Sequence, residues 1–77
     1  MSTEAKIRQI ITDNANDIDG TLIPIDAKLL DAGLDSLDIA TILLEVQEEF
    51  GVTIPEEQEE GLGTIGEIAA YVEQAQS

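Results

Sequence analysis

The first apolar pattern in the chain predicts a helix close to its start. Ile7, Ile10 and Ile11 lie three and four residues apart, which places them on one face of a helix. Ser2 and Thr3 precede them, and either could be the N-cap, because both residue types favour that position. We therefore expect a first helix that begins at Ser2 or Thr3 and ends near residues 14–16.

A second helix is predicted over residues 36–50, and it is the most apolar of the chain. Gly51 follows it and is typical of a helix C-terminus. Its apolar residues cover more of the helical wheel than one packing partner would bury. Several helices must surround this helix, or part of its apolar face contacts a ligand or a protein. The apolar residues are Leu37, Ile39, Ala40, Ile42, Leu43, Leu44, Val46 and Phe50.

The remaining third of the chain predicts one short helix and one long helix. Residues 52–55 are extended, because Pro55 disfavours helical backbone in the residue before it. Residues 56–60 suit a short helical turn. The run Thr64-Ile65-Gly66-Glu67 has the spacing of a capping box and begins the last helix. We expect residues 74–77 to fray.

A long loop over residues 16–34 separates the first two predicted helices. Pro24 interrupts any helix there, and Asp17-Ile18-Asp19-Gly20 is typical of a turn. We expect five apolar residues to pin the loop to the core, namely Leu22, Ile23, Ile25, Leu29 and Leu30. The predicted fold of residues 1–77 is one all-α domain, a small bundle of three main helices with a short helix before the last.

Charge and composition exclude many functions. The 77 residues include 17 acidic and 3 basic residues, with no Cys and no His, for a net charge of −14. The chain has no thiolate or imidazole for catalysis, and too few bases to bind nucleic acid. No secretory signal or membrane-spanning run is present, so we expect a cytoplasmic monomer. Its acidic surface favours basic partners.

Two groups of acidic residues resemble a metal site and a catalytic site, but neither group has the other residues that such a site needs. Asp17, Asp19 and Gly20 fit part of a calcium-binding EF-hand loop, but Ala15 would stand at the first ligand position and cannot ligate. Paired glutamates elsewhere are typical of a solvated helix face. We predict neither a catalytic site nor a specific metal site.

The start of the second predicted helix is the most informative segment. In Asp35-Ser36-Leu37-Asp38, either Asp35 or Ser36 could be the N-cap, and Asp38 lies in the favourable first turn. Simple capping explains these residue types. Asp35 alone suffices as the cap, however, which leaves the Ser36 hydroxyl available beside the most apolar helix.

Residues 33–50 resemble the signature of acyl carrier proteins, and the order of the other segments extends this resemblance over nearly the whole chain. The resemblance implies that Ser36, flanked by Asp35 and Leu37, carries a covalent 4'-phosphopantetheine whose thiol holds acyl groups as thioesters. A magnesium-dependent holo-acyl-carrier-protein synthase would attach it. The carrier would catalyse nothing itself and would serve enzymes of fatty acid, specialised lipid or polyketide-type biosynthesis.

The resemblance also implies two surfaces. Acyl synthases, transferases and ligases with basic docking surfaces would recognise one face of the second helix, at Asp38, Thr41, Leu44, Glu45 and Glu48. The acyl chain would enter the apolar interior, which we predict to be lined by Ile7, Ile11, Ile39, Ala40, Ile42, Leu43, Val46, Phe50, Ile54, Ile65, Ile68 and Val72.

Some positions depart from the pattern of carriers in ordinary fatty acid synthesis. Those carriers usually have Glu where Thr41 stands and often have Met where Leu44 stands. We interpret these differences as signs of a specialised, free-standing bacterial carrier. Two alternatives stay open: a carrier of aminoacyl or D-alanyl groups, and a small acidic interaction module without a prosthetic group that mimics charge.

Overall fold

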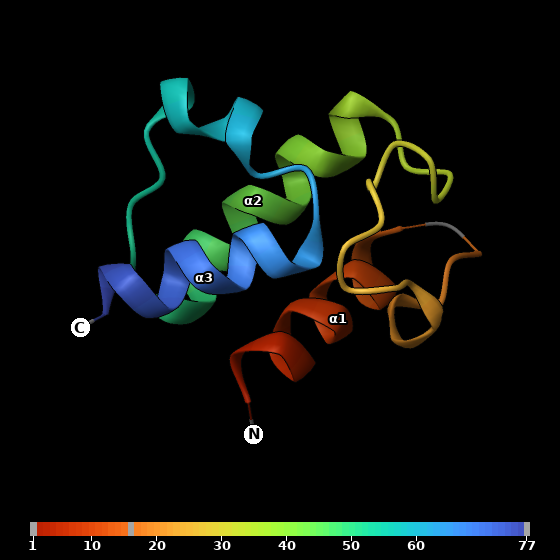
Figure 1. The fold of residues 1–77 in the computed structure, drawn as a ribbon, viewed down its shortest axis with the longest axis horizontal. Coiled ribbons are helices and arrows are strands. Elements are labelled where there is room, and N and C mark those ends of the chain that lie inside the picture. Colours follow the sequence, from red (N-terminus) through yellow and green to blue (C-terminus); the bar gives the residue numbers. More distant parts are fainter. Residues whose placement is uncertain (1, 16, 77) are drawn as a thin grey trace.

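Helices make up the regular structure of the described part of the chain, residues 2–15 and 17–76, in a computed structural model (Figure 1). They are α1 (Thr3–Asn14), η1 (Gly20–Leu22), α2 (Ser36–Phe50), η2 (Glu56–Gly61) and α3 (Ile65–Ala75), where η denotes a 3-10 helix. Within those residues there is no strand, only one isolated antiparallel bridge between Lys28 and Thr64. The predicted all-α fold is confirmed. Predictions that concern Asn16 and Ser77 lie outside the described residues.

Each long helix begins at a side-chain cap, as its sequence predicts. Ser2 Oγ accepts from the Ala5 amide at 3.1 Å, and Thr64 Oγ1 accepts from the Glu67 amide at 3.1 Å. The second half of the capping box at α3 differs from the prediction, because Glu67 Oε1 accepts from the Gly63 amide instead of the Thr64 amide. These caps satisfy amides that a helix start leaves without partners.

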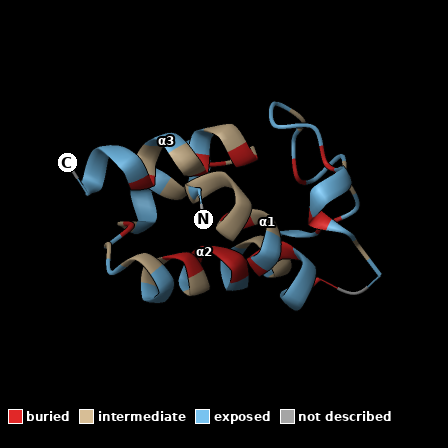
Figure 2. Cartoon of the chain, turned by 90° about the horizontal axis from the view of Figure 1, so that it is seen from below, coloured by how far each residue is buried: buried red, intermediate tan, exposed pale blue. Residues whose placement is uncertain are grey.

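The core forms where α1 packs against both α2 and α3 (Figure 1). Figure 2 shows buried positions alternating with exposed ones along α2, as expected for a helix with one face inward. None of the described residues buries a polar or charged side chain. The buried hydrophobic residues are Ile7, Ile10, Ile11, Ala15, Ile23, Leu29, Leu34, Ile42, Leu43, Val46, Ile54, Leu62, Ile65, Ile68 and Val72.

The long loop contains the η1 turn, and only part of its apolar sequence packs inward. Ile23 and Leu29 are buried as predicted. The prediction was wrong for the other three residues, since Leu22 is 78% exposed, Ile25 44% and Leu30 60%. Polar and backbone contacts hold much of the loop instead, so these side chains are not needed as anchors.

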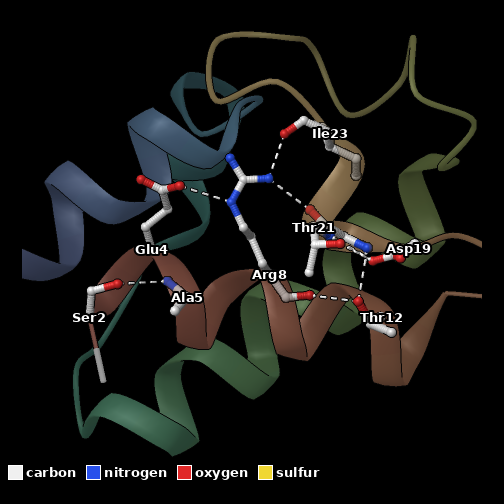
Figure 3. Close-up of polar contacts among 9 residues, drawn as sticks. Ser2, Glu4, Ala5, Arg8, Thr12, Asp19, Thr21 and Ile23 are labelled. Carbon is white, nitrogen blue, oxygen red and sulfur yellow. Dashed lines mark hydrogen bonds and ion pairs between the residues drawn. The ribbon is translucent and has the colours of Figure 1, made fainter.

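Arg8 on α1 is the main polar anchor of the η1 turn (Figure 3). Its guanidinium donates to the carbonyl of Gly20 at 2.8 Å and to that of Ile23 at 2.5 Å, and it pairs with Glu4 at 2.9 Å. The Gly20 amide in turn donates to Thr12 Oγ1 at 2.8 Å. One guanidinium nitrogen, Nη1, donates to both loop carbonyls and so fixes the turn against α1.

Asp19 caps the η1 turn on its solvent side (Figure 3). Its Oδ1 accepts from the Thr21 hydroxyl at 2.6 Å and from the Thr21 amide at 2.9 Å. Hydrogen bonds from the Thr21 hydroxyl and then its amide favour the carboxylate, so they lower the pKa of Asp19 below its usual value. The turn is therefore tightest when Asp19 is ionised.

Residues 74–76 form contacts that the predicted fraying does not include. α3 continues to Ala75, and the side-chain amide of Gln76 donates to the Phe50 carbonyl at 3.0 Å. The Tyr71 hydroxyl donates to the Thr53 carbonyl at 3.0 Å. These bonds attach α3 and the residue after it to the end of α2 and to the segment that follows it.

Candidate functional site

The site begins at the N-terminus of α2, where two aspartates close a capping box. Asp35 Oδ1 accepts from the Asp38 amide at 2.8 Å, and Asp38 Oδ2 accepts from the Asp35 amide at 3.3 Å. Ser36 is the first residue of the helix and is exposed. Within residues 2–15 and 17–76, no group forms a hydrogen bond with its hydroxyl. The cap is therefore complete without Ser36, and its hydroxyl is accessible.

Ser36 borders an open cleft of about 510 Å³. One side of the cleft is α2, and the others come from the loop before α2, from η2 and the residues after it, and from the first turn of α3. The lining residues are Lys28, Leu30, Ser36, Ile39, Ala40, Leu43, Glu59, Glu60, Leu62, Gly63 and Glu67. The candidate serine thus stands beside a space that a flexible group attached to it could enter.

The inner surface of this cleft is apolar, and charged side chains also line it. Leu43 and Leu62 are 1% and 5% exposed and belong to the core, so the cleft reaches the outer surface of the core. Ile39 and Ala40 continue this surface along α2. Aliphatic walls favour a flexible apolar group through removal of its surface from water. The cleft therefore suits an apolar chain linked to a polar attachment point.

Lys28 is the one basic residue among those that line the cleft, and its amino group forms no ion pair with a described residue. The other two bases of the chain are engaged elsewhere. Lys6 pairs with Glu49 at 3.3 Å, and Arg8 pairs with Glu4 at 2.9 Å. Lys28 is thus an accessible positive charge in a cleft that also holds three glutamates.

The structure separates the twelve predicted pocket residues into two groups. Ile39, Ala40 and Leu43 line the cleft beside Ser36. The other nine do not line it: eight are buried in the core, and Phe50 packs against the core with part of its surface exposed. These nine residues are Ile7, Ile11, Ile42, Val46, Phe50, Ile54, Ile65, Ile68 and Val72. Their role in holding an acyl chain stays a prediction.

Sequence reasoning missed part of the cleft wall, namely Lys28, Leu30, Leu62 and the nearby glutamates of η2 and α3. Leu30 was expected to be a core anchor, and its exposure was not foreseen. Leu62 stands between two glycines, a pattern that could have marked an apolar residue held in a turn. Nothing in the sequence placed Lys28 beside Ser36.

The predicted recognition residues all lie on α2. Thr41, Leu44 and Glu48 are exposed, whereas Asp38 and Glu45 are half-buried. Leu37 at 75% and Leu44 at 55% exposure are large apolar side chains on the same helix, together with the acidic residues. This combination of apolar and acidic groups is typical of a protein-binding surface.

The described residues contain neither a cluster suited to a metal ion nor a membrane-spanning helix. None of the groups of acidic side chains there has the arrangement needed to hold a metal ion. No helix within residues 2–15 and 17–76 combines the length and apolar character required to cross a lipid bilayer.

Comparison with known proteins decides the family. Residues 5–72 match the family described as "Phosphopantetheine attachment site". An acyl carrier protein of Akkermansia muciniphila is 34% identical over 76 residues, which cover 97% of this chain and 94% of the relative. The chain belongs to the acyl carrier protein family. An acyl carrier protein of Helicobacter acinonychis is also 34% identical, over 68 residues that cover 87% of this chain and 86% of the relative.

The fold agrees with this membership of the acyl carrier protein family. The solved structure of the acyl carrier protein from Enterococcus faecalis superposes with a TM-score of 0.72, covering 97% of this chain and 99% of that one, at 24% identity. An acyl carrier protein is a non-catalytic carrier with a covalent 4'-phosphopantetheine group. The alternative of an acidic module without a prosthetic group is therefore not favoured.

The geometry beside α2 is compatible with that prosthetic group. A phosphodiester needs an accessible hydroxyl, and Ser36 offers one that the capping box does not use. The arm also needs space beside its attachment point, and the cleft of about 510 Å³ borders Ser36. Ser36 thus has the hydroxyl that 4'-phosphopantetheine requires, and the cleft has space for the arm.

Proposed function

We propose that Ser36 is the residue that carries 4'-phosphopantetheine, and that this chain transports acyl intermediates on it. The observation that supports this proposal best is the exposed Ser36 hydroxyl at the first residue of α2, free of capping bonds and beside the cleft. When bound, the arm supplies a thiol that holds the acyl group as a thioester. The chain has no Cys of its own, so this thiol is its only one.

Asp35 and Asp38 have a positioning role in this proposal. Their reciprocal bonds to the amides of Asp38 and Asp35 keep the first turn of α2 intact. Ser36 is thereby held outward on a rigid helix end while a holo-acyl-carrier-protein synthase acts on it. Leu37, exposed next to it, offers apolar surface to that enzyme.

The outer face of α2 is the surface that we propose for docking of acyl synthases, transferases and ligases. Glu45 and Glu48 form no ion pair with a described base, so their charge is available to a basic partner. Exposed Leu44 adds apolar area between them and Ser36 along the helix. Such partners bind briefly, and charge complementarity speeds their encounter.

We further propose a specialised pathway for this carrier, in lipid or polyketide-type biosynthesis. Thr41 supports this part of the proposal, because it places an uncharged hydroxyl in the middle of the acidic face. That hydroxyl donates to the Leu37 carbonyl at 3.1 Å. A partner that binds this face therefore contacts less negative charge at position 41 than it would if a Glu stood there.

The attachment site is tested by intact-mass analysis after incubation with a holo-acyl-carrier-protein synthase, coenzyme A and Mg²⁺. We expect the parent chain to gain the mass of one phosphopantetheine. Ser36→Ala should gain nothing. Ser2→Ala is the matched control, since Ser2 is also a serine at a helix start but caps α1 with its hydroxyl. It should accept the group as fully as the parent.

The outcomes separate the attachment site from the general function. An adduct on Ser36→Ala would place the arm on another residue and overturn the role of Ser36. A parent chain that never accepts the group would contradict carriage of acyl groups by this chain.

A further inference from the structure

We propose that Lys28 is a positioning residue for the prosthetic arm, and that its amino group pairs with the phosphodiester joined to Ser36. This inference rests on the proposed attachment at Ser36. It adds an ionic contact that would hold the first part of the arm over the cleft. The observation behind it is that Lys28 and Ser36 line the same cleft although seven residues lie between them in the sequence.

Lys28 is available for this role because its charge is not used elsewhere in the described residues. Lys6 pairs with Glu49 and lies 6.0 Å from the centre of the Phe50 ring. Arg8 is committed to Glu4 and to two loop carbonyls. Within residues 2–15 and 17–76, Lys28 has no comparable partner for its amino group.

The backbone around Lys28 is held in place, so its side chain starts from a fixed point. The Lys28 carbonyl accepts from the amides of Asp31 at 2.9 Å and Ala32 at 3.1 Å. The next amide, that of Leu29, donates to the Gly63 carbonyl at 2.8 Å, beside the bridge between Lys28 and Thr64. A lysine with a fixed backbone loses less conformational entropy when it binds an ion.

Electrostatics favour such a partner. A phosphodiester adds one negative charge to a chain whose net charge is already −14. The amides at the start of α2 would ordinarily attract it, but Asp35 already occupies the Asp38 amide, and both aspartates add negative charge. Glu59 and Glu60 line the cleft as well and repel the phosphate. Lys28 is the positive charge on the cleft that can offset this repulsion.

The experiment compares apo and holo forms of four chains: the parent, Lys28→Gln, Lys28→Arg and Lys6→Gln. Lys6→Gln is the matched control, because it removes the same charge from α1, away from the cleft. Intact mass first establishes that each holo sample carries the group. Melting temperature and the ³¹P chemical shift of the phosphodiester, at low and high NaCl, are then measured.

We expect conversion from apo to holo to lower the melting temperature of Lys28→Gln by about 2–4 °C more than that of the parent at low salt. Lys28→Arg and Lys6→Gln should behave like the parent, and high salt should remove the difference. The ³¹P shift should move in Lys28→Gln and stay unchanged in Lys6→Gln.

A second measurement needs no variant with altered charge. In the parent chain, the ¹⁵Nζ resonance of Lys28 should shift on conversion to the holo form, while that of Lys6 should not. An unmoved Lys28 resonance, or equal effects of Lys28→Gln and Lys6→Gln, would overturn the proposed contact. Failure of the parent to become holo is a different result, because it contradicts the proposed function itself.

Discussion

At the scale of single residues, Gly20 is where the long loop comes closest to α1. A Cβ atom built on Gly20 would lie 2.3 Å from the Arg8 carbonyl oxygen and 3.1 Å from Thr12 Oγ1. The nearer atom belongs to helix backbone and cannot rotate away. The absence of a side chain at Gly20 is therefore what allows Arg8 and Thr12 to bind the η1 turn.

We predict that Gly20→Ala destabilises the fold by about 1–3 kcal/mol, because α1 and the turn must separate to admit the methyl group. Urea denaturation of the apo protein measures this free energy of unfolding. Gly61→Ala is the control, since no atom lies within 4 Å of a Cβ there. It should change stability by no more than about 0.5 kcal/mol. Equal losses in the two variants would contradict the close approach.

At the scale of the helices, the start of α2 combines a structural cap with the candidate attachment site. Asp35 supplies the cap through its bond to the Asp38 amide at 2.8 Å, and Asp38 returns a longer bond at 3.3 Å. One turn of helix therefore depends on side chains that also give the site its negative charge. A change at Asp35 would therefore affect both the stability of α2 and the charge beside the candidate attachment site.

We predict that Asp35→Ala lowers the free energy of unfolding by about 1 kcal/mol, since the Asp38 amide loses its acceptor. Asp35→Asn should retain most of the stability, because asparagine also caps well and removes one charge from an acidic surface. Thermal unfolding followed by circular dichroism measures both variants. Asp31→Ala is the control for loss of charge alone, and an equal loss there would argue against capping as the cause.

At the scale of the whole molecule, a small aliphatic core has to resist a large excess of negative charge. The radius of gyration is 11.1 Å, so many of the 17 carboxylates lie within one or two screening lengths of one another at physiological salt. Only two ion pairs with basic side chains are formed among the described residues. Self-repulsion therefore opposes the compact state, and its strength depends on the solution.

We predict that millimolar Mg²⁺ or Ca²⁺ raises the melting temperature more than NaCl of equal ionic strength, because divalent ions gather more strongly at clustered carboxylates. The two ions should act alike and without a fixed stoichiometry, since the described residues hold no group arranged to ligate a metal. Differential scanning calorimetry makes the comparison. A larger effect of Ca²⁺ that saturates at one equivalent would reveal a specific site and contradict this account.

Local signals in the sequence were sufficient to predict much of the fold. The caps at Ser2, Asp35 and Thr64 and the left-handed Gly51, with φ of 66°, define helix ends that depend on neighbouring residues alone. The exposure of Leu30 could not be predicted in the same way. Whether a loop side chain is buried depends on how distant segments pair, and those pairings leave no periodic pattern.

As with the fold, only the part of the candidate site that depends on neighbouring residues could be predicted from the sequence. Asp35, Ser36 and Leu37 follow from a motif that is contiguous in the chain. The cleft could not be predicted from the sequence. Lys28, Ile39 and Leu62 come together only when the loop, α2 and the segment after η2 pack against one another. The helical wheel identified an excess of apolar surface on α2, but it could not separate core positions such as Ile42 from cleft positions such as Ile39.

The bond from the Tyr71 hydroxyl to the Thr53 carbonyl has a practical consequence. Tyr71 is the only tyrosine of the chain, and tryptophan is absent, so near-ultraviolet emission comes almost entirely from this one ring. A carbonyl acceptor at 3.0 Å makes that emission sensitive to whether α3 stays joined to the segment after α2. The fluorescence of Tyr71 can therefore be used to follow the packing of α3 against the segment after α2 without any added dye.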